Sequence, residues 1–408
     1  MDFMQNRRHN FLIFACAFLW IMMMGSKNVY TAELDVLQGV FNAPKADVSM
    51  AMTWYFITYS SLQVLLFFIL DKINIKWYLF ITIFLSGIVT VLVAFMTNLW
   101  SLYWLLALNG LLQAAVWGMC IAILSKYLPK EKMPFANTVM NIGTAIAGII
   151  SYGSASLFVG SGMWNVPFIF LGIILSISGV LFFLAVYLCQ KLPTNDNEVR
   201  IEKTTSEIDL LPLTSKLKKA LFFIVSFIIS LLIHSVFYAG MNWMPSLLTE
   251  VHAQKSSVGI LISVLAPLAT ILGSVFAIKH CEKYKNYIAV ALVYMLITTL
   301  FSLLLLFLFN SNMYLAIICL ILFLVIAMGE ITIVFSVLSL KMSKYINAGA
   351  HSGLMNAAGG YAAGFAPTIA GAIIDGSSWF SLYLTLFIIC FALLLVVLGF
   401  YFATKKRA

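Results

Sequence analysis

Long apolar stretches, separated by short polar connections, fill most of the chain. Twelve are expected, at 10–31, 48–70, 77–97, 99–126, 135–159, 165–189, 220–248, 257–278, 287–309, 313–340, 350–374 and 379–403. A helix needs about 20 apolar residues to cross a bilayer, whereas a strand of a membrane barrel has about ten residues of alternating polarity. Helices also satisfy their own backbone hydrogen bonds in lipid. The pattern therefore predicts an all-α membrane protein with twelve transmembrane helices.

The composition indicates that most of the protein surface faces lipid and not water. The 408 residues are 62% hydrophobic and 10% charged, whereas a soluble domain is about 25% charged. Arg7 and Arg8 precede the first apolar run, as in a signal peptide. The run continues past Met24 into Gly25 and Ser26 without a convincing cleavage site. We interpret it as an uncleaved first helix.

The placement of positive charge predicts the orientation in the membrane. With the N-terminus inside, nearly all of the 24 Lys and Arg residues fall in inside segments. The exceptions are Lys45 and Lys255 in outside connections, and Lys27 within the first helix. Because cytoplasmic loops are enriched in Lys and Arg, we expect a multi-pass protein of the cell's inner (plasma) membrane with both termini cytoplasmic. The net charge of +9 then reports topology and not a nucleic-acid partner.

The sequence contains no signature of enzymatic chemistry. The six cysteines lie in predicted helices or at their cytoplasmic edge, where no disulfide framework is expected. Their spacing does not match a metal site, and the chain has no catalytic triad or phosphate loop. We therefore expect no metal, no cofactor and no enzymatic activity.

A polar stretch at 190–219 divides the chain into two halves, 1–189 and 220–408, of six predicted helices each. Short matches recur between the halves at nearly one offset: Ser125-Lys126-Tyr127 with Ser343-Lys344-Tyr345, Met140-Asn141 with Met355-Asn356, and Trp164 with Trp379. In series they indicate a duplicated unit, and hence two pseudo-symmetric six-helix bundles joined by a cytoplasmic linker. Transporters built in this way bind solute between the repeats and rock one half against the other.

Six plus six helices, a long central connection and an internal duplication resemble the major facilitator superfamily. Between helices 2 and 3 that family carries Gly-x-x-x-Asp-Arg-x-Gly-Arg-Arg or close variants. Here the stretch reads Phe67-Phe-Ile-Leu-Asp71-Lys72-Ile-Asn74-Ile-Lys76, in which the acidic and basic positions match. The resemblance implies the superfamily fold, and Asp71 with Lys72 as a cytoplasmic latch between states.

Two further stretches are similar to the organophosphate/phosphate antiporters and related organic-anion symporters. They are Asn109-Gly-Leu-Leu-Gln113-Ala-Ala-Val-Trp117 in helix 4 and Asn242-Trp-Met-Pro245-Ser-Leu-Leu-Thr-Glu250 in helix 7. That branch clamps phosphate with arginines in helices 1 and 7. Here the corresponding positions are Ser26-Lys27 and Gly240-Met241-Asn242. Since Lys is a point charge and Arg a bidentate fork, we expect a carboxylate or a zwitterion before a phosphate.

An ionisable side chain within a membrane helix is costly and needs a reason, and three such residues are candidates for function: Lys27, His234 and Glu330. Glu330 could bind and release a coupling proton, or be paired permanently with Lys27 or the backbone. Lys27 could attract an anionic group, or extend its amine to the outer interface. His234 could carry a proton, or be a neutral packing residue. In the family resembled, the helices of these residues line the central cavity.

Helical spacing places other polar side chains in stripes. Asn109, Gln113 and Trp117 are four residues apart on helix 4, as are Tyr55 and Tyr59 on helix 2, and His234 and Tyr238 on helix 7. Such stripes line a cavity or supply interhelical hydrogen bonds of about 0.6 kcal/mol each. The predicted solute-binding residues are Lys27, Tyr55, Tyr59, Gln113, Trp117, Tyr238 and Asn242, with Glu330 and His234 for proton coupling.

The sequence therefore predicts a secondary transporter that moves a small organic anion or zwitterion by alternating access, coupled to a proton or another ion. The alternatives are an organophosphate/phosphate exchanger and a receptor that binds solute without moving it. The expected partners are the solute, the coupling ion and the lipid bilayer, and the expected oligomeric state is a monomer.

Overall fold

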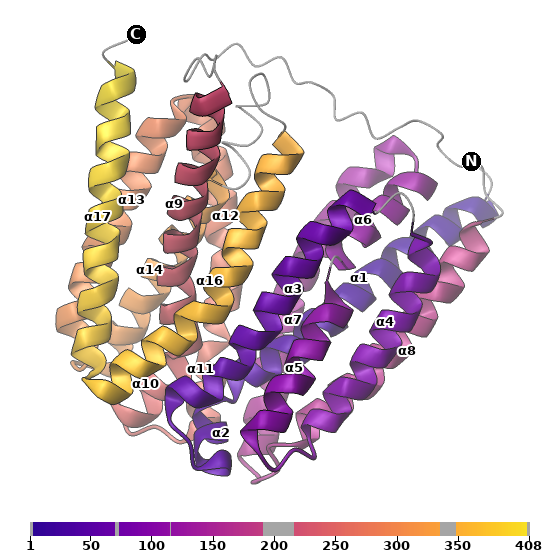
Figure 1. Cartoon of the computed structure of the whole chain (residues 1–408), viewed down its shortest axis with the longest axis horizontal. Helices are drawn as coiled ribbons and strands as arrows, with labels where there is room; N and C mark the ends of the chain where they lie inside the picture. Colours follow the sequence, from indigo (N-terminus) through magenta and orange to yellow (C-terminus); the bar gives the residue numbers. More distant parts are fainter. Residues whose placement is uncertain (1–2, 70–72, 115, 191–215, 335–347, 406–408) are drawn as a thin grey trace. The chain divides into compact units, whose positions relative to one another are not determined.

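The computed structural model describes residues 3–69, 73–114, 116–190, 216–334 and 348–405. Among these residues the regular structure is helical and no strand occurs, as predicted (Figure 1). The chain forms two compact units, Met1–Asn42 with Trp54–Ile201 and Ala43–Thr53 with Glu202–Ala408. Ala43–Thr53 belongs to unit 2 although it lies within the first half of the sequence.

Unit 1 contains eight described helical elements and shares α3 with unit 2. They are α1 (Phe3–Ala32), α2 (Leu34–Phe41), α4 (Ile75–Val93), α5 (Leu99–Gln113), α6 (Val116–Tyr127), the 3-10 turn η2 (Lys130–Lys132), α7 (Met133–Val159) and α8 (Val166–Cys189). The shared helix is α3 (Lys45–Ile69), whose start belongs to unit 2 and whose remainder belongs to unit 1. Within unit 1, α1 packs against α7 and α8, and α4 packs along α8.

Unit 2 contains the remaining described helices. They are α9 (Lys216–Asn242), α10 (Met244–Glu250), α11 (Ser256–Ser263), α12 (Leu265–Tyr284), α13 (Tyr287–Leu308), α14 (Met313–Thr332), α16 (Ala348–Gly376) and α17 (Trp379–Lys405). The described residues form 11 helical stretches long and apolar enough to cross a membrane. Helix α3, with 25 residues, is a twelfth stretch of sufficient length.

Three spans predicted as continuous helices are each divided in two: 99–126 into α5 and α6, 220–248 into α9 and α10, and 257–278 into α11 and α12. At the first break Ala114 has ψ 139° and leaves the helical region. At the other two, Pro245 and Pro267 each lie within three residues of the break. A proline supplies no N–H for the preceding turn. Such interruptions are tolerated in membranes where neighbouring helices satisfy the freed backbone groups.

Glycines allow the closest helix crossings in both units. In unit 1, a Cβ at Gly87 of α4 would lie 2.5 Å from the carbonyl oxygen of Gly172 in α8. In unit 2, a Cβ at Gly273 of α12 would lie 2.0 Å from the carbonyl oxygen of Val325 in α14. Small residues at helix interfaces let backbones approach closely in membranes. The crossing of α12 and α14 also positions Glu330, which follows Val325 by little more than one turn.

We expect Gly273→Ala to destabilise the protein by about 1–3 kcal/mol, because overpacking forces backbone to move. Gly399→Ala in α17 is the matched control, since a Cβ at Gly399 meets nothing within 4 Å. Thermal unfolding of both variants in the same detergent measures the difference. Equal unfolding temperatures for the two variants would show that the crossing is looser than described.

Candidate functional site

Lys27 lies in α1 among aromatic and polar side chains of unit 1. Its Nζ atom is 5.2 Å from the centroid of the Phe56 ring, a cation–π distance. Among the described residues, the salt bridges join Lys45 to Glu250 and Asp375, and none involves Lys27. This partly buried cation therefore has an aromatic face as its described partner and no carboxylate.

A buried hydrogen-bond network lies beside Lys27 and centres on Gln113, the last residue of α5. Its Nε2 donates to Ser86 Oγ at 2.9 Å and to Ser26 Oγ at 3.3 Å. Its Oε1 accepts from the Tyr55 hydroxyl at 2.6 Å. Ser86 Oγ in turn donates to Asn109 Oδ1 at 2.5 Å. The network joins α1, α3, α4 and α5, so Gln113 and Tyr55 are engaged by the protein and fix the backbone next to Lys27.

Trp117 and Tyr59 make aromatic contacts. The predicted single face of Asn109, Gln113 and Trp117 is wrong, because the helix breaks between Gln113 and Trp117. The Trp117 ring packs edge-on against Trp20 of α1 at 4.8 Å. The Tyr59 ring stacks on Tyr55 at 5.8 Å. Both side chains are half-buried, unlike the fully enclosed Gln113.

The helix α9 carries three predicted residues of unit 2 in successive turns. The His234 Nδ1 lies 2.7 Å from the carbonyl oxygen of Ser230, which can only accept, so this nitrogen carries the proton. His234 Nε2 lies 2.8 Å from the position of a Cβ on Gly359 of α16. Tyr238 stacks one turn later, with ring centroids 6.3 Å apart. Asn242 is buried at the end of α9.

Glu330 is enclosed in α14 of unit 2. The residue is 1% exposed, and its Oε1 has no hydrogen-bond partner. The ring of Tyr294 from α13 packs on the preceding residue, because a Cβ on Gly329 would lie 2.3 Å from Tyr294 Cε1. A charged carboxylate in such a place is costly unless it is paired or protonated. The arrangement suits a carboxyl group that exchanges a proton.

The sequence interpretation missed an ion cluster at the start of α3. Lys45 Nζ lies 2.6 Å from Glu250 Oε1 and 3.2 Å from Asp375 Oδ1. The Lys45 backbone N–H donates to Asp375 Oδ2 at 2.7 Å, and Trp379 Nε1 donates to Glu250 Oε2 at 3.1 Å. Lys45 was one of two predicted outside lysines, and this exception to the charge pattern was the available signal. Movement of the α3 start relative to α16 must break these contacts.

The predicted latch residues Asp71 and Lys72 lie outside the described residues. Helix α4 begins soon after them at Ile75, and its Lys76 is described. Lys76 Nζ lies 4.9 Å from the centroid of the Phe183 ring and donates to Gln190 Oε1 at 3.2 Å. The basic residue at this end of the motif is thus held against α8.

A second missed residue is Glu33, between α1 and α2. It is fully buried, and both carboxyl oxygens have no hydrogen-bond partner. Burial raises the pKa of this carboxyl well above its ordinary value, because removal from water disfavours the charged form. In the sequence Glu33 lies just past the first apolar run, and that position alone does not reveal its burial.

The raised pKa of Glu33 predicts a pH-dependent effect on stability. A carboxyl whose pKa is higher in the folded state stabilises the fold fully below its unfolded pKa, and this contribution is lost as the pH rises through the folded value. Glu33→Gln removes the group, so we expect it to raise the unfolding temperature more at about pH 8 than at about pH 5. Exposed Glu131, changed to Gln, is the control; an equal response of both variants would contradict the prediction.

Long apolar helices indicate a multi-pass membrane protein. The chain belongs to the Major Facilitator Superfamily, whose family model matches residues 12–351. Transporters of this family are not enzymes, in agreement with the sequence prediction.

Among curated proteins, 119 residues are 31% identical to the glucose-6-phosphate exchanger SLC37A2 of Danio rerio, covering 28% of this chain and 24% of the relative. The membrane sensor protein UhpC of Escherichia coli (strain K12) is 25% identical over 154 residues, covering 36% of this chain and 32% of the relative. The chain thus matches about a quarter to a third of the length of these relatives.

Solved transporters share the fold over nearly the whole chain. A bacterial homolog to the human lysosomal transporter Spinster, inward-facing and occupied, has a TM-score of 0.73 at 13% identity, covering 97% of each chain. A D-xylose-proton symporter has a TM-score of 0.72 at 13% identity, covering 96% of this chain and 97% of that chain. At this identity the likeness shows the fold alone.

Proposed function

We propose that the protein moves a small organic anion or zwitterion, such as a carboxylate, an amino acid or a sugar acid, by proton-coupled alternating access. It acts in the cell's inner (plasma) membrane, with both termini cytoplasmic. Alternation involves Asp71 and Lys72 as a cytoplasmic latch, and each cycle passes the solute and a proton across the same bilayer.

Lys27 carries this proposal. A lysine ammonium within a membrane helix is costly unless an opposite charge or a polar group compensates it. The described partner of Lys27 is the face of the Phe56 ring. A ring face stabilises the ammonium charge less than a carboxylate would. An anionic group of the solute completes the pair. The ammonium is a compact point charge, which suits a carboxylate without demanding the planar geometry of phosphate.

The other predicted residues divide by their surroundings. Half-buried Tyr59, Trp117 and Tyr238 retain surface for contact with solute, and Asn242 supplies an amide at the end of α9. Gln113 and Tyr55 act by holding Ser26 and its neighbour Lys27 in place through the buried network. Glu330 takes up and releases the coupling proton, with His234 as a second proton-binding group.

Exchange of an organic phosphate for inorganic phosphate is the second candidate. It is favoured by the similarity of 119 residues to a protein named a glucose-6-phosphate exchanger. A third outcome is binding without transport, since another relative is named a membrane sensor protein. The absence of arginine from the predicted helix interiors weighs against phosphate, because arginine makes the bidentate contacts that phosphate favours.

Thermal stabilisation of the purified protein by a panel of carboxylates, amino acids, sugars and organic phosphates tests the proposal. A ligand that binds the folded state raises its stability. Stabilisation by carboxylates or amino acids supports the proposal, and flux of that solute into vesicles separates transport from sensing. Stabilisation by phosphates alone would overturn it in favour of exchange.

A further inference from the structure

Tyr294 connects the surroundings of Glu330 to the polar end of α12. Its ring packs on the backbone of Gly329, directly before Glu330. Its hydroxyl lies 2.8 Å from His280 Nδ1, and the two rings pack edge-on at 5.8 Å. A buried carboxyl, a phenol and an imidazole therefore follow one another across α14, α13 and α12.

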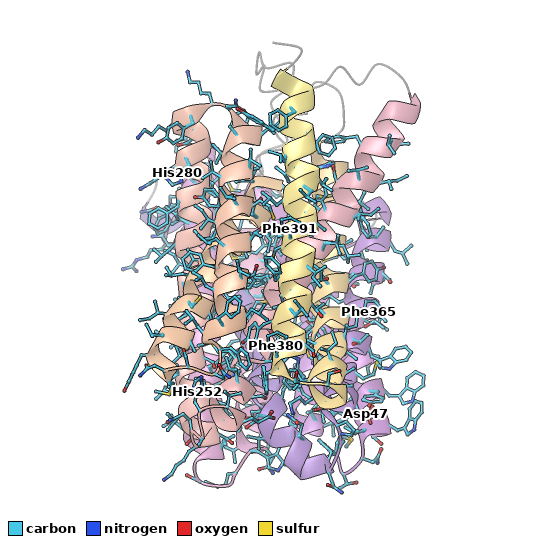
Figure 2. All side chains as sticks on the ribbon, turned by 90° about the vertical axis from the view of Figure 1, so that its left-hand side faces the viewer. Asp47, His252, His280, Phe365, Phe380 and Phe391 are labelled. Carbon is cyan, nitrogen blue, oxygen red and sulfur yellow. The ribbon has the colours of Figure 1, made fainter. Side chains whose placement is uncertain are left out.

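His280 stands at the border between this interior and water. It is exposed, and it belongs to the last two turns of α12 together with Lys279, Glu282 and Lys283. Figure 2 shows His280 and His252 toward opposite ends of unit 2. In the predicted orientation, the end that carries His280 faces the cytoplasm. Imidazole takes up and releases protons near physiological pH.

We propose that Tyr294 and His280 form a proton relay between Glu330 and the cytoplasm, separate from the solute-binding residues. This inference rests on the proposed role of Glu330 as the proton-binding residue. Tyr294 and His280 belong to none of the motifs found in the sequence.

The relay balances its protons, and it starts with Nδ1 of His280 accepting from the Tyr294 hydroxyl and Nε2 carrying the ring proton. When Glu330 is deprotonated toward the cytoplasm, its carboxyl O–H bond breaks as an O–H bond forms on Tyr294. The former Tyr294 hydroxyl proton moves to His280 Nδ1, where an N–H bond forms. The Nε2–H proton of the resulting imidazolium is then released to water, which leaves the Nδ1–H tautomer. Loss of the Nδ1 proton and uptake of a proton at Nε2, both by exchange with water at this exposed ring, restore the starting tautomer. Rotation of the Glu330 side chain toward the Tyr294 hydroxyl makes the first step, since its Oε1 is held by no hydrogen bond.

Among the residues that the structure describes, the other groups around this site do not offer an equivalent path. Two thiols lie within electrostatic range, Cys281 of α12 at Tyr294 and Cys390 of α17 at Glu330, and thiols are weak donors. The Tyr284 ring lies beside His280 on the same helix, with ring centroids 6.2 Å apart. Where α9 meets α14, Gly240 faces the apolar side chains of Leu320, Phe323 and Leu324. The hydroxyl of Tyr294 is thus the polar link with a hydrogen bond toward the surface.

The test follows protonation of Glu330 directly, with the proton as the probe. Protein in lipid nanodiscs receives a microsecond acid jump from a photolysed caged proton, and time-resolved infrared absorption records the carboxylic acid band that Glu330→Gln removes. We expect Tyr294→Phe and His280→Ala each to slow the rise of this band by about a hundredfold, the scale of one lost proton-transfer group. Exogenous imidazole should restore the rate in His280→Ala, because that site is exposed.

Tyr314→Phe and His252→Gln are the matched controls, since Tyr314 is exposed and His252 lies at the other end of unit 2 (Figure 2). Unchanged rates in Tyr294→Phe and in His280→Ala would overturn the relay and leave the role of Glu330 intact. Slowing without imidazole rescue would likewise overturn it, because a structural loss is not repaired by free imidazole. If the wild type shows no band that Glu330→Gln removes, the proposed proton coupling itself is wrong.

Discussion

Glu330→Gln should abolish accumulation of solute against its gradient while leaving solute exchange intact. Glutamine keeps the size of the side chain but cannot take up a proton, so transport loses its link to the pH gradient. Solute inside vesicles is then expected to stop at the outside concentration. Uptake of labelled solute under an imposed pH gradient measures accumulation, and counterflow without a gradient measures exchange.

Exposed Glu131, changed to Gln, is the control for this pair of assays and should keep both activities. If Glu330→Gln loses exchange as well, with an unchanged unfolding temperature, the carboxyl belongs to solute binding. If accumulation persists in the variant, another group carries the proton, and His234 would be the next residue to replace. The three results thus separate coupling, binding and an alternative proton carrier.

The membrane fold could be predicted because hydrophobic length is a property of the sequence alone. The breaks inside three spans could not. Ala114 leaves the helical region although it is neither a proline nor a glycine. The break therefore depends on packing against neighbouring helices, which the sequence does not reveal. Pro245 and Pro267 are visible in the sequence as possible helix breaks. Because proline is often tolerated inside a membrane helix, neither residue alone predicted where a helix ends.

The candidate site could be predicted in part. Spacing placed Gln113 near Asn109, and Gln113 Nε2 does donate to Asn109 Oδ1 at 3.3 Å. The other two acceptors of this amide come from other helices, Ser26 in α1 and Ser86 in α4. The same limit applies to His280 and Tyr294, whose hydrogen bond joins two helices. Contacts between helices depend on how each helix is rotated about its own axis. A helix that is apolar on all sides gives little indication of that rotation in its sequence.

The placement of charged residues predicted the orientation in the membrane, and its exceptions also pointed to an ion cluster. Two outside lysines were exceptions to the positive-inside pattern, and one of them, Lys45, proved to bind Glu250 and Asp375. Because α3 begins in unit 2 and continues in unit 1, these ion pairs hold the start of a helix that the two units share. Lys45, Glu250 and Asp375 all belong to unit 2, so the pairs fix the start of α3 within that unit.

Lys27→Met should weaken binding of an anionic solute by about 10- to 150-fold. The estimate follows from the 1.5–3 kcal/mol that a hydrogen bond to a charged group contributes. Methionine keeps the length of the apolar stem, so packing against Phe56 is largely retained. The dissociation constant of the carboxylate found by thermal stabilisation measures the loss. The variant Lys126→Met, at an exposed lysine of the same unit, should bind as the wild type does.

Lys27→Arg distinguishes recognition of charge from recognition of shape. Arginine keeps the positive charge but adds a planar fork that matches phosphate. We therefore expect the variant to retain carboxylate binding and to gain affinity for organic phosphates relative to the wild type. Equal binding of the anion by wild type and Lys27→Met would show that this lysine does not meet the solute. The buried network around Gln113 would then have a purely structural role in joining α1, α3, α4 and α5.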